Sequence, residues 1–416
     1  MEQITACRVC RSPDIVSFFD LGRQPLANSL LPRPDEPEVF YPLSLRWCSS
    51  CRLVQLDHTA DPKELFSSYV WVTGTSNTAQ EYARRFQAEL ARRCPERDGY
   101  VLEIASNDGT FLAPFRDAGY RVLGVDPAQN IVRMAVSNGI PSVCAFWGNE
   151  TAESIRKDHG PAHIIFARNV LPHVANTHEF VNGLKTCLRD DGILAIEVHY
   201  SKIILEELHY DSIYHEHLCY FTLRSLERLL NGYGFLVFDI TTSPISGGSI
   251  VVYASKGERS EEPVVQEYRD RENRSGTNER KSWETFAEQS FRHREELLEM
   301  LRDCRQHGTV IGYGASARSS TLLNFCGIDH TMLPMIADRN PLKYKKYTAG
   351  THILIENPDV AMKLNPHYVL ILAWNFASEI MDFLEKQYGY NGHYIIPFPN
   401  QPLLRNSGQP FLSLRA

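Results

Sequence analysis

Short apolar runs alternate with helical patterns through the middle of the chain. Continuous apolar runs of this length are typical of parallel strands that are buried on both faces. An amphipathic helix is predicted over 79–93, and more helices are predicted between the strands that follow it. The predicted strands are 100–104, 121–125, 163–167 and 192–198. This order predicts a doubly wound α/β domain.

The pattern differs before and after this region. Residues 1–62 are rich in proline and cysteine and lack helical periodicity. Residues 256–306 are strongly charged, and apolar residues recur at helical spacing only late in the stretch, so we expect a polar loop and then a long surface helix. A second α/β pattern follows, with strands predicted at 309–313, 333–337, 368–372 and 394–397.

A chain of 416 residues is too long for one ordinary domain. The three patterns predict a small N-terminal domain over 1–62, an α/β domain with a linker helix over 63–300, and a second α/β domain over 301–416. The predicted fold class is therefore α/β.

Composition and charge narrow the class of protein. A hydrophobic content of 43% with 22% charged residues is ordinary for a soluble globular protein. The formal charge of −7, without a basic stripe interleaved with aromatic residues, argues against a nucleic-acid partner. The chain shows neither a signal-peptide pattern nor an apolar run long enough to cross a bilayer, so we expect a cytoplasmic protein with no membrane partner.

Four of the ten cysteines form two C-x-x-C pairs, Cys7 with Cys10 and Cys48 with Cys51. A loop of this kind presents two sulfurs to one ion, which suits tetrahedral Zn²⁺. The alternative is two unrelated pairs of buried thiols. Because no histidine or carboxylate nearby offers an open catalytic position, we expect a structural Zn²⁺ that contributes folding energy to a small domain.

Residues 101–109 join a predicted strand to a predicted helix, and small residues there let the backbone approach a ligand. Glu103 lies at the strand end, and Asp126 ends the next strand, where a carboxylate can accept both ribose hydroxyls. The loop has a single glycine, Gly109, and its Asp108 would repel a phosphate. A cationic sulfonium cofactor, S-adenosylmethionine, therefore fits better than NAD. The alternative is a turn that binds no ligand.

Residues 213–221 gather titratable and aromatic side chains. If the segment is extended, Tyr214 and Glu216 face one way while His215 and His217 face the other. Three interpretations of the histidines remain open: a pair of metal ligands, ordinary half-buried histidines, or a base whose neutral form is available near pH 7.

Two further polar residues, Asn169 and His173, follow the strand predicted at 163–167. Doubly wound folds bind ligands at this edge of the sheet, beyond the carboxyl ends of the strands. Both residues are therefore candidates for the binding site.

In their order along the chain, these motifs resemble the nucleotide-sugar C-methyltransferases, which place a methyl group at C-3 of dTDP-4-keto-deoxysugars. The resemblance covers nearly the whole chain and implies a zinc-binding N-terminal domain, a class I methyltransferase-like domain that binds S-adenosylmethionine, and a Rossmann-like C-terminal domain that helps to hold the nucleotide. The segments that carry it are LGRQPLAN at 21–28, the two cysteine pairs, LEIASNDG at 102–109, NVLPH at 169–173, YHEH at 214–217, GGS at 247–249 and GYGA at 312–315.

Carried over to this sequence, the resemblance implies a role for each candidate residue. His217 would be the catalytic base, with Tyr214 and Glu216 on the sugar and with His173 and Tyr69 lining the same pocket. The cofactor would be bound by Glu103, Ala105, Asn107, Asp108, Gly109, Asp126 and Asn169. The nucleotide-linked keto-sugar would contact Ser249, Tyr313, Gly314, Ser316, Arg318 and Asn324.

The implied reaction removes the C-3 proton beside the 4-keto group, so that C-3 can attack the methyl carbon of the sulfonium. Three departures from the family pattern bear on the substrate: Ala105 in place of a glycine, Ser246 and Val251 in place of histidine and arginine, and Arg318-Ser-Ser320 in place of a lysine-glycine pattern. Two alternatives therefore remain. One is an enzyme on the same scaffold that performs epimerisation or oxygen methylation, and the other is a non-catalytic zinc-containing binding protein. We expect a monomer or a weak dimer.

Overall fold

The computed structural model describes residues 1–408 except 63–64, 66–71, 76 and 244–246. Tyr69 and Ser246, which the sequence analysis singled out, lie outside the described residues. The chain divides into two compact units. Unit 1 comprises residues 1–16, 46–202 and 216–280, and unit 2 comprises residues 17–45, 203–215 and 281–416.

Unit 1 contains a seven-stranded sheet with the strand order β12-β13-β10-β9-β6-β7-β8. Five of its strands are β6 (Tyr100–Ile104), β7 (Arg121–Asp126), β8 (Ser142–Cys144), β9 (Ala162–Arg168) and β10 (Leu188–His199). These five are parallel, and the four strands predicted for this region are confirmed among them.

The last two strands of this sheet are β12 (Leu236–Ser243) and β13 (Ser249–Ser255). β13 runs antiparallel to both of its neighbours, β10 and β12. A parallel sheet with one reversed strand in this position is the arrangement of class I methyltransferases, and it confirms the expected α/β class. The strand order reverses between β6 and β9, so a ligand site is expected beyond the carboxyl ends of these two strands.

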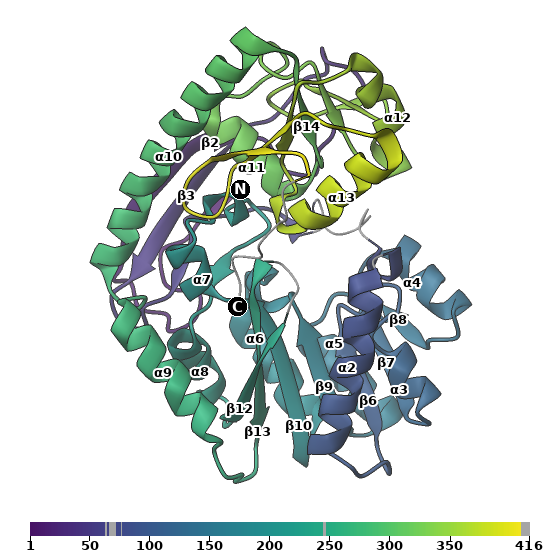
Figure 1. The fold of residues 1–416 in the computed structure, drawn as a ribbon. Helices are drawn as coiled ribbons and strands as arrows, with labels where there is room; N and C mark the ends of the chain where they lie inside the picture. Colours follow the sequence, from purple (N-terminus) through teal and green to yellow (C-terminus); the bar gives the residue numbers. More distant parts are fainter. Residues whose placement is uncertain (63–64, 66–71, 76, 244–246, 409–416) are drawn as a thin grey trace. The chain divides into compact units, whose positions relative to one another are not determined.

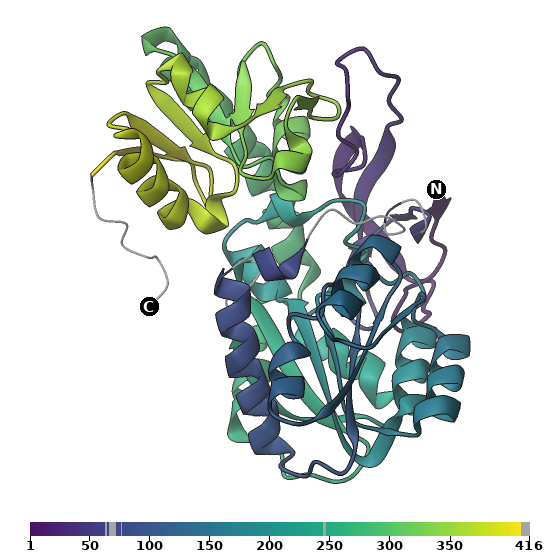
Figure 2. The same ribbon diagram turned by 90° about the vertical axis from the view of Figure 1, so that its right-hand side faces the viewer.

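Helix α2 (Asn77–Arg93) covers one face of the sheet together with the short helix α3 (Ala113–Asp117). Tyr82, Phe86 and Leu90 recur every four residues along α2, so they form one apolar stripe. All three are buried against Phe111 and strand residues such as Phe166. The helix predicted at 79–93 is thereby confirmed, and Figures 1 and 2 show α2 lying along the sheet.

Four more helices of unit 1 lie between strands of this sheet: α4 (Gln129–Ser137), α5 (Asn149–His159), α6 (Thr177–Cys187) and α8 (Leu223–Asn231). Helix α7 (Ser201–Glu206) begins in unit 1 and continues into unit 2, and α9 (Pro263–Ser275) follows β13 in unit 1.

The N-terminal residues form a four-stranded sheet of order β11-β4-β3-β2. Its strands are β2 (Ile15–Gln24), β3 (Tyr41–Cys48), β4 (Val54–Leu56) and β11 (Cys219–Tyr220). A separate two-stranded sheet pairs β1 (Glu2–Gln3) with β5 (His58–Thr59). β11 comes from much later in the chain, and Leu56 N donates to Leu218 O at 3.0 Å, so the residues around His217 are anchored to the N-terminal segment.

Unit 2 contains a second seven-stranded sheet, of order β16-β17-β15-β14-β18-β19-β20. Its strands are β14 (Val310–Tyr313), β15 (Met335–Ala337), β16 (Lys346–Tyr347), β17 (Leu354–Glu356), β18 (Tyr368–Ile371), β19 (His393–Ile396) and β20 (Leu403–Asn406). The order reverses between β14 and β18, as in a Rossmann-like sheet, and the four strands predicted here are confirmed.

Three helices flank this sheet: α11 (Ala317–Cys326), α12 (Pro358–Ala361) and α13 (Ala377–Tyr388). The long helix α10 (Arg280–His307) completes the unit and is the largest helix in Figure 1. An aromatic cluster holds α10 in unit 2, because Phe19 packs edge to face against Phe286, Phe291 and Phe325 at ring distances of 5.7–5.9 Å.

One expectation from the sequence is wrong, and one condition that the sequence analysis considered is not met. The polar loop expected at the start of 256–306 is mostly helix α9, which begins with Pro263 at a helix start and ends at Gly276 with φ of 66°. It folds because Val265, Tyr268 and Glu272 form a narrow buried stripe despite the surrounding charge. Residues 214–216 are not extended but form a turn, so the alternation of facing directions does not apply before β11.

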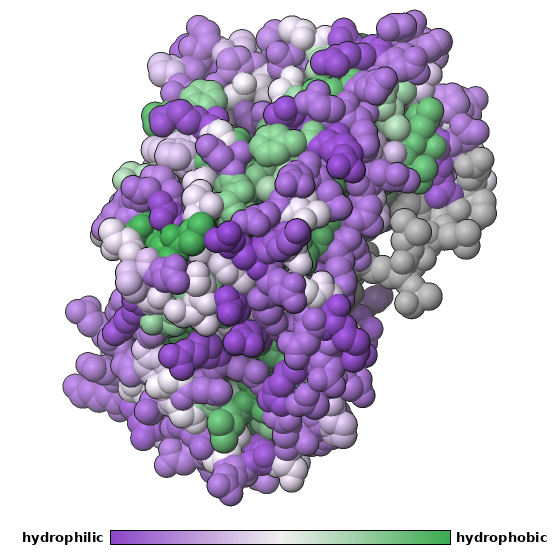
Figure 3. Space-filling view, turned by 90° about the vertical axis from the view of Figure 1, so that its left-hand side faces the viewer, coloured by the Kyte–Doolittle hydropathy of each residue, from purple (hydrophilic) through white to green (hydrophobic). Residues whose placement is uncertain are grey.

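The face in Figure 3 is mostly hydrophilic, with small separate groups of apolar side chains. Within the described residues, every helix is too short or too polar to cross a bilayer.

Candidate active site and metal centre

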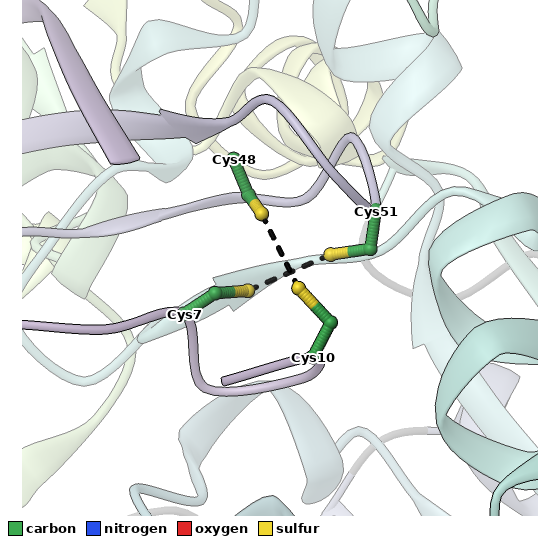
Figure 4. Close-up of side chains that lie close together, drawn as sticks. All are labelled: Cys7, Cys10, Cys48 and Cys51. Atoms are coloured by element: carbon green, nitrogen blue, oxygen red, sulfur yellow. Dashed lines mark hydrogen bonds between the residues drawn. The ribbon is translucent and has the colours of Figure 1, made fainter. Parts of the chain in front are cut away.

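The four cysteines of the two C-x-x-C pairs converge on one point in unit 1 (Figure 4). The two loops are built alike. Arg11 N donates to Cys7 O at 2.9 Å and Arg52 N donates to Cys48 O at 3.0 Å, while Arg11 and Arg52 both have positive φ, of 60° and 68°. Each turn therefore aims two sulfurs toward the other pair.

The sulfur positions fit a tetrahedral ion. Cys7 Sγ lies 3.5 Å from Cys51 Sγ, and Cys10 Sγ lies 3.4 Å from Cys48 Sγ. Zn–S bonds of about 2.3 Å in tetrahedral geometry place sulfurs about 3.8 Å apart, so the cluster needs to open by only a few tenths of an ångström. Four thiolates without a nearby open position suit a closed structural site, as the sequence predicted.

The loop after β6 holds three residues in left-handed backbone conformations. Ala105 has φ of 56°, Asn107 of 49° and Gly109 of 80°. For a residue with a Cβ this region costs about 1–2 kcal/mol, so the surrounding contacts must stabilise it. Asn107 Oδ1 accepts from Thr73 N at 2.9 Å, and Asp108 Oδ2 accepts from Gly74 N at 2.9 Å. The segment before α2 is therefore tied to this loop.

Two carboxylates stand at this edge of the sheet. Asp126 is buried, and its two oxygens accept from Asn107 N and Ala128 N, each at 2.9 Å. Glu103 is 3% exposed, and its Oε2 has no hydrogen-bond partner among the described residues. Burial raises the pKa of Glu103 well above its usual value, while the nearby Arg168 cation acts in the opposite sense. A buried acceptor without a partner fits a cationic donor of a ligand, such as an ammonium group.

Asn169 is fixed at the carboxyl end of β9 by a buried ion pair. Its φ is 51°, and its Nδ2 donates to Glu197 Oε1 at 3.1 Å. Glu197 is fully buried, accepts from Arg168 Nε at 2.8 Å and from Ser243 Oγ at 2.7 Å, and its backbone oxygen accepts from Asn169 N at 2.8 Å. The Arg168 guanidinium also lies 3.2 Å from the centre of the Phe111 ring. This network holds Asn169 at the switch point beside β6.

His173 and His217 lie together near the same edge. His173 is in the short 3-10 helix η2 (Leu171–His173), which contacts β11, and its ring centroid is 4.8 Å from that of His217 at an interplanar angle of 67°. Burial lowers the pKa of His173 to about 4, although backbone groups of Glu216 and Asn169 act in the opposite sense. His173 is therefore neutral near pH 7, and both histidines are only partly accessible.

The other predicted residues of unit 1 lie around this edge. Ser249 begins β13 directly opposite His199, at the carboxyl end of β10, and is buried. Glu216 is buried in the turn that precedes His217. Tyr214 and His215 belong to unit 2, where Tyr41 packs edge to face on His215 at 6.1 Å.

In unit 2, four of the five predicted residues cluster beyond β14. Gly314 has φ of 96°, and a Cβ there would meet Ala373 Cβ at 2.5 Å, so glycine is required. Ser316 caps α11 by accepting from Ser319 N at 3.2 Å, and Arg318 follows in the first turn. Tyr313 ends β14, and its buried hydroxyl has no partner among the described residues.

Asn324 lies apart from this cluster, about two helical turns further along α11. Its Nδ2 donates to Ser320 O at 2.9 Å and to Ala349 O at 3.2 Å. The side-chain amide of Asn324 therefore links α11 to the backbone at Ala349.

Sequence reasoning missed several polar residues at the two ligand edges. In unit 2, Asp211 is buried and accepts from Arg318 Nη2 at 3.1 Å and from Trp374 Nε1 at 2.7 Å. Asp338 accepts from Ala315 N at 2.8 Å and pairs with Lys343 Nζ at 3.1 Å. Glu197 of unit 1 and Asp338 carried a usable signal, since each is a carboxylate in or directly after a predicted strand.

Three family matches cover most of the chain. The family described as "Putative zinc binding domain" matches residues 7–66, "Methyltransferase domain" matches 76–239, and "C-methyltransferase C-terminal domain" matches 244–399. The C-methyltransferase NovU of Streptomyces niveus is 36% identical over 403 residues, which are 95% of this chain and 96% of NovU. This chain belongs to the C-methyltransferase family. It is an S-adenosylmethionine-dependent C-methyltransferase related to NovU.

Two solved methyltransferase structures are similar to part of the chain. A magnesium protoporphyrin IX methyltransferase from Synechocystis PCC 6803 is 14% identical, covers 43% of this chain and 80% of its own, and has a TM-score of 0.34. An S-adenosylmethionine-dependent methyltransferase from Clostridium acetobutylicum is 11% identical, covers 43% of this chain and 92% of its own, and has a TM-score of 0.35.

Proposed function

We propose that this enzyme methylates C-3 of a nucleotide-linked 4-keto-sugar and that His217 is the base. The observation that carries the proposal is the ring contact between His217 and His173. His173 follows Asn169 by four residues, at the ligand edge of the unit 1 sheet. Methylation of an sp³ carbon requires removal of a proton that is acidic only beside a carbonyl group. A histidine near neutral pH suits this task.

The residues at the switch point fit S-adenosylmethionine. Glu103 offers a buried acceptor for the methionine ammonium, and Asp126 has carboxylate lone pairs left for the ribose hydroxyls. The loop of Ala105, Asn107, Asp108 and Gly109 brings backbone close to the ligand, and Asn169 faces the same edge. When bound, the cofactor supplies an electrophilic methyl group on a cationic sulfur.

The neutral state of His173 supports the role of His217. A base that takes up a proton becomes a cation, and a second cation 4.8 Å away would raise the free energy of that state. Because burial keeps His173 neutral, it adds no such repulsion. Tyr214, Glu216 and Tyr69 complete the proposed sugar contacts, as the family resemblance implies.

For the nucleotide moiety we propose Tyr313, Gly314, Ser316 and Arg318, with Ser249 contacting the sugar. Backbone amides at the start of α11 suit a phosphate group, as does a guanidinium in the first turn. Asn324 is included only through the resemblance. We also propose that the four cysteines bind one structural Zn²⁺ and that the domains are 1–62, 63–300 and 301–416.

The experiment is incubation of the full chain with methyl-labelled S-adenosylmethionine and a panel of freshly generated nucleoside-diphosphate 4-keto-sugars. The proposal expects one product heavier by a methyl group, with the label on carbon and the C-3 proton lost in its NMR spectrum. A label on oxygen, or inverted sugar without label, would instead favour the alternatives on the same scaffold.

A further inference from the structure

A second group of side chains whose atoms could hold a metal ion lies at the opposite edge of the unit 1 sheet. Cys94 follows the last residue of α2, and His163 is the second residue of β9. In a parallel sheet the amino ends of the strands share one edge, so this group is separate from the ligand edge after β6 and β9. Cys94, Glu96 and His163 present their ligand atoms within 4.8 Å of one another.

Cys94 and His163 are already in contact. Cys94 Sγ lies 3.1 Å from His163 Nε2, and Glu96 Oε2 lies 3.9 Å from the same nitrogen. A tetrahedral ion with bonds of about 2.3 Å to sulfur and about 2.0 Å to nitrogen needs about 3.5 Å between these two atoms. A shift of a few tenths of an ångström therefore admits an ion between the three donors.

The other nitrogen of His163 faces a second carboxylate. His163 Nδ1 lies 3.7 Å from Asp98 Oδ1, and Arg189 Nη1 donates to that oxygen at 3.0 Å. A carboxylate behind an imidazole favours the proton on Nδ1, which leaves the Nε2 lone pair for a metal. Histidine ligands of metals usually have a carboxylate, a backbone carbonyl or a water beside the nitrogen that does not bind the ion.

The His163 ring is held in this position by close packing. A Cβ on Gly99 would lie 2.6 Å from His163 Cβ, so only glycine allows the approach. Cys94 is 1% exposed and His163 is 4% exposed, whereas Glu96 is 65% exposed at its side chain. Cys94 and His163 therefore offer two buried donor atoms in fixed positions. Glu96 offers a third donor from a solvent-exposed side chain, so an ion can reach the site from solvent.

We propose that Cys94, Glu96 and His163 bind a divalent transition-metal ion, with Zn²⁺ as the natural candidate, in addition to the four-cysteine site. A thiolate with an imidazole selects zinc-like ions over Mg²⁺ or Ca²⁺, and a single site with three protein ligands leaves a fourth position for water. Binding displaces the Cys94 thiol proton to solvent, and the ion then joins the end of α2 to β9.

The test is a metal titration of the full chain after loosely held ions have been removed with a mild chelator. The proposal expects Zn²⁺ to bind at one equivalent beyond the ion retained by the four cysteines, and to raise the melting temperature. With Co²⁺ it expects thiolate-to-cobalt charge-transfer absorption. Titration with Mg²⁺ should give neither effect.

Single substitutions test whether the extra ion binds at Cys94, Glu96 and His163. Cys94→Ser should lose the extra equivalent and the charge-transfer band, and Glu96→Gln, at an exposed position, should weaken binding roughly tenfold without affecting the fold. Cys144→Ser, which changes an exposed cysteine, should bind like the wild type. If Cys94→Ser does not fold, Glu96→Gln alone decides. No extra equivalent in the wild type, or unchanged binding by Glu96→Gln, would overturn the proposal.

Discussion

The imidazole rings of His173 and His217 lie edge to face with their centroids 4.8 Å apart. The contact joins η2, which follows β9 of the methyltransferase sheet, to His217, which lies two residues before β11 of the N-terminal sheet. Burial keeps His173 neutral, and we propose that His217 is the member of the pair that exchanges a proton with the substrate.

His217→Ala should lower kcat by about 10²–10⁴-fold, the usual contribution of a general base. Affinity for S-adenosylhomocysteine, measured by calorimetry, should stay within a factor of about two, because the residue is not among those proposed to hold the cofactor. His159→Ala, at an exposed position on α5, is the matched control and should keep full activity. Full activity of His217→Ala would reject the assignment.

The lowered pKa of His173 predicts a pH-dependent loss of stability. The unfolded histidine titrates near 6.5 and the folded one near 4, so between these values the unfolded state binds more protons. The free energy of unfolding should therefore fall as the pH decreases through this window, and His173 should account for about 3 kcal/mol of the decrease. Above pH 7 the titration of His173 should contribute no pH dependence.

Urea unfolding at several pH values measures this contribution by comparison with His173→Asn. The variant lacks the titrating group, so its stability should fall less steeply between pH 6.5 and pH 4. Other buried histidines, such as His209 and His293, are present in both proteins and cancel in the difference. Parallel curves for the two proteins would show that His173 is not held neutral.

Replacing Ala105 tests the strained cofactor loop. Ala105→Gly removes the cost of a left-handed alanine, about 1–2 kcal/mol. The glycine also makes the unfolded chain more flexible, which raises the entropic cost of folding by about 0.5–1 kcal/mol. A net gain of up to about 1 kcal/mol in unfolding free energy is expected. Ala118→Gly, where φ is −82°, has no strain to relieve and should destabilise instead. Equal destabilisation of both variants would contradict the strain.

The buried ion pair behind Asn169 should be sensitive to the loss of one charge. Glu197→Gln leaves the Arg168 cation without its partner and should cost about 3–5 kcal/mol of stability. Cofactor affinity should fall as well, because Asn169 Nδ2 loses a carboxylate acceptor. Thermal unfolding and calorimetry measure the two effects, with Glu150→Gln in the exposed first turn of α5 as the control. A Glu197→Gln variant as stable as this control would contradict the network.

Zinc content tests the four-cysteine site. Metal analysis of the purified chain should find one tightly bound Zn²⁺, and Cys48→Ser should lose it together with much of the stability of the N-terminal sheet. The exposed Cys144→Ser should retain the ion. Zinc-free protein that is folded and fully stable would remove the structural role.

Much of the fold was predictable because its strands are continuous apolar runs. β6 coincides with the predicted 100–104, and β14 and β18 differ from prediction by one residue. Helix α9 was missed because only Val265, Tyr268 and Glu272 are buried among many charged residues, so the stripe is too thin for the pattern to show. β11 was missed because two residues paired to a distant strand have no periodicity.

Several residues at the ligand edge of the unit 1 sheet could be placed there from the sequence, but their mutual contacts could not. Glu103, Asp126 and Asn169 follow from their places at strand ends. Strand positions alone did not place His173 beside His217, since their contact depends on the pairing of β11 with β4; only the family resemblance implied a shared pocket. The role of Arg168 could not be predicted for a related reason. An arginine at a strand end carries no signal in the sequence, and only the structure shows the buried Glu197 and the Phe111 ring beside it.

Proton exchange at C-3 tests the central claim most directly. In D₂O, with S-adenosylhomocysteine in place of the methyl donor, the wild-type enzyme should exchange the C-3 hydrogen of its 4-keto-sugar for deuterium, as followed by NMR. His217→Ala should not exchange it above the uncatalysed rate, whereas His159→Ala should exchange it normally. Wild-type exchange that persists undiminished in His217→Ala would contradict the account.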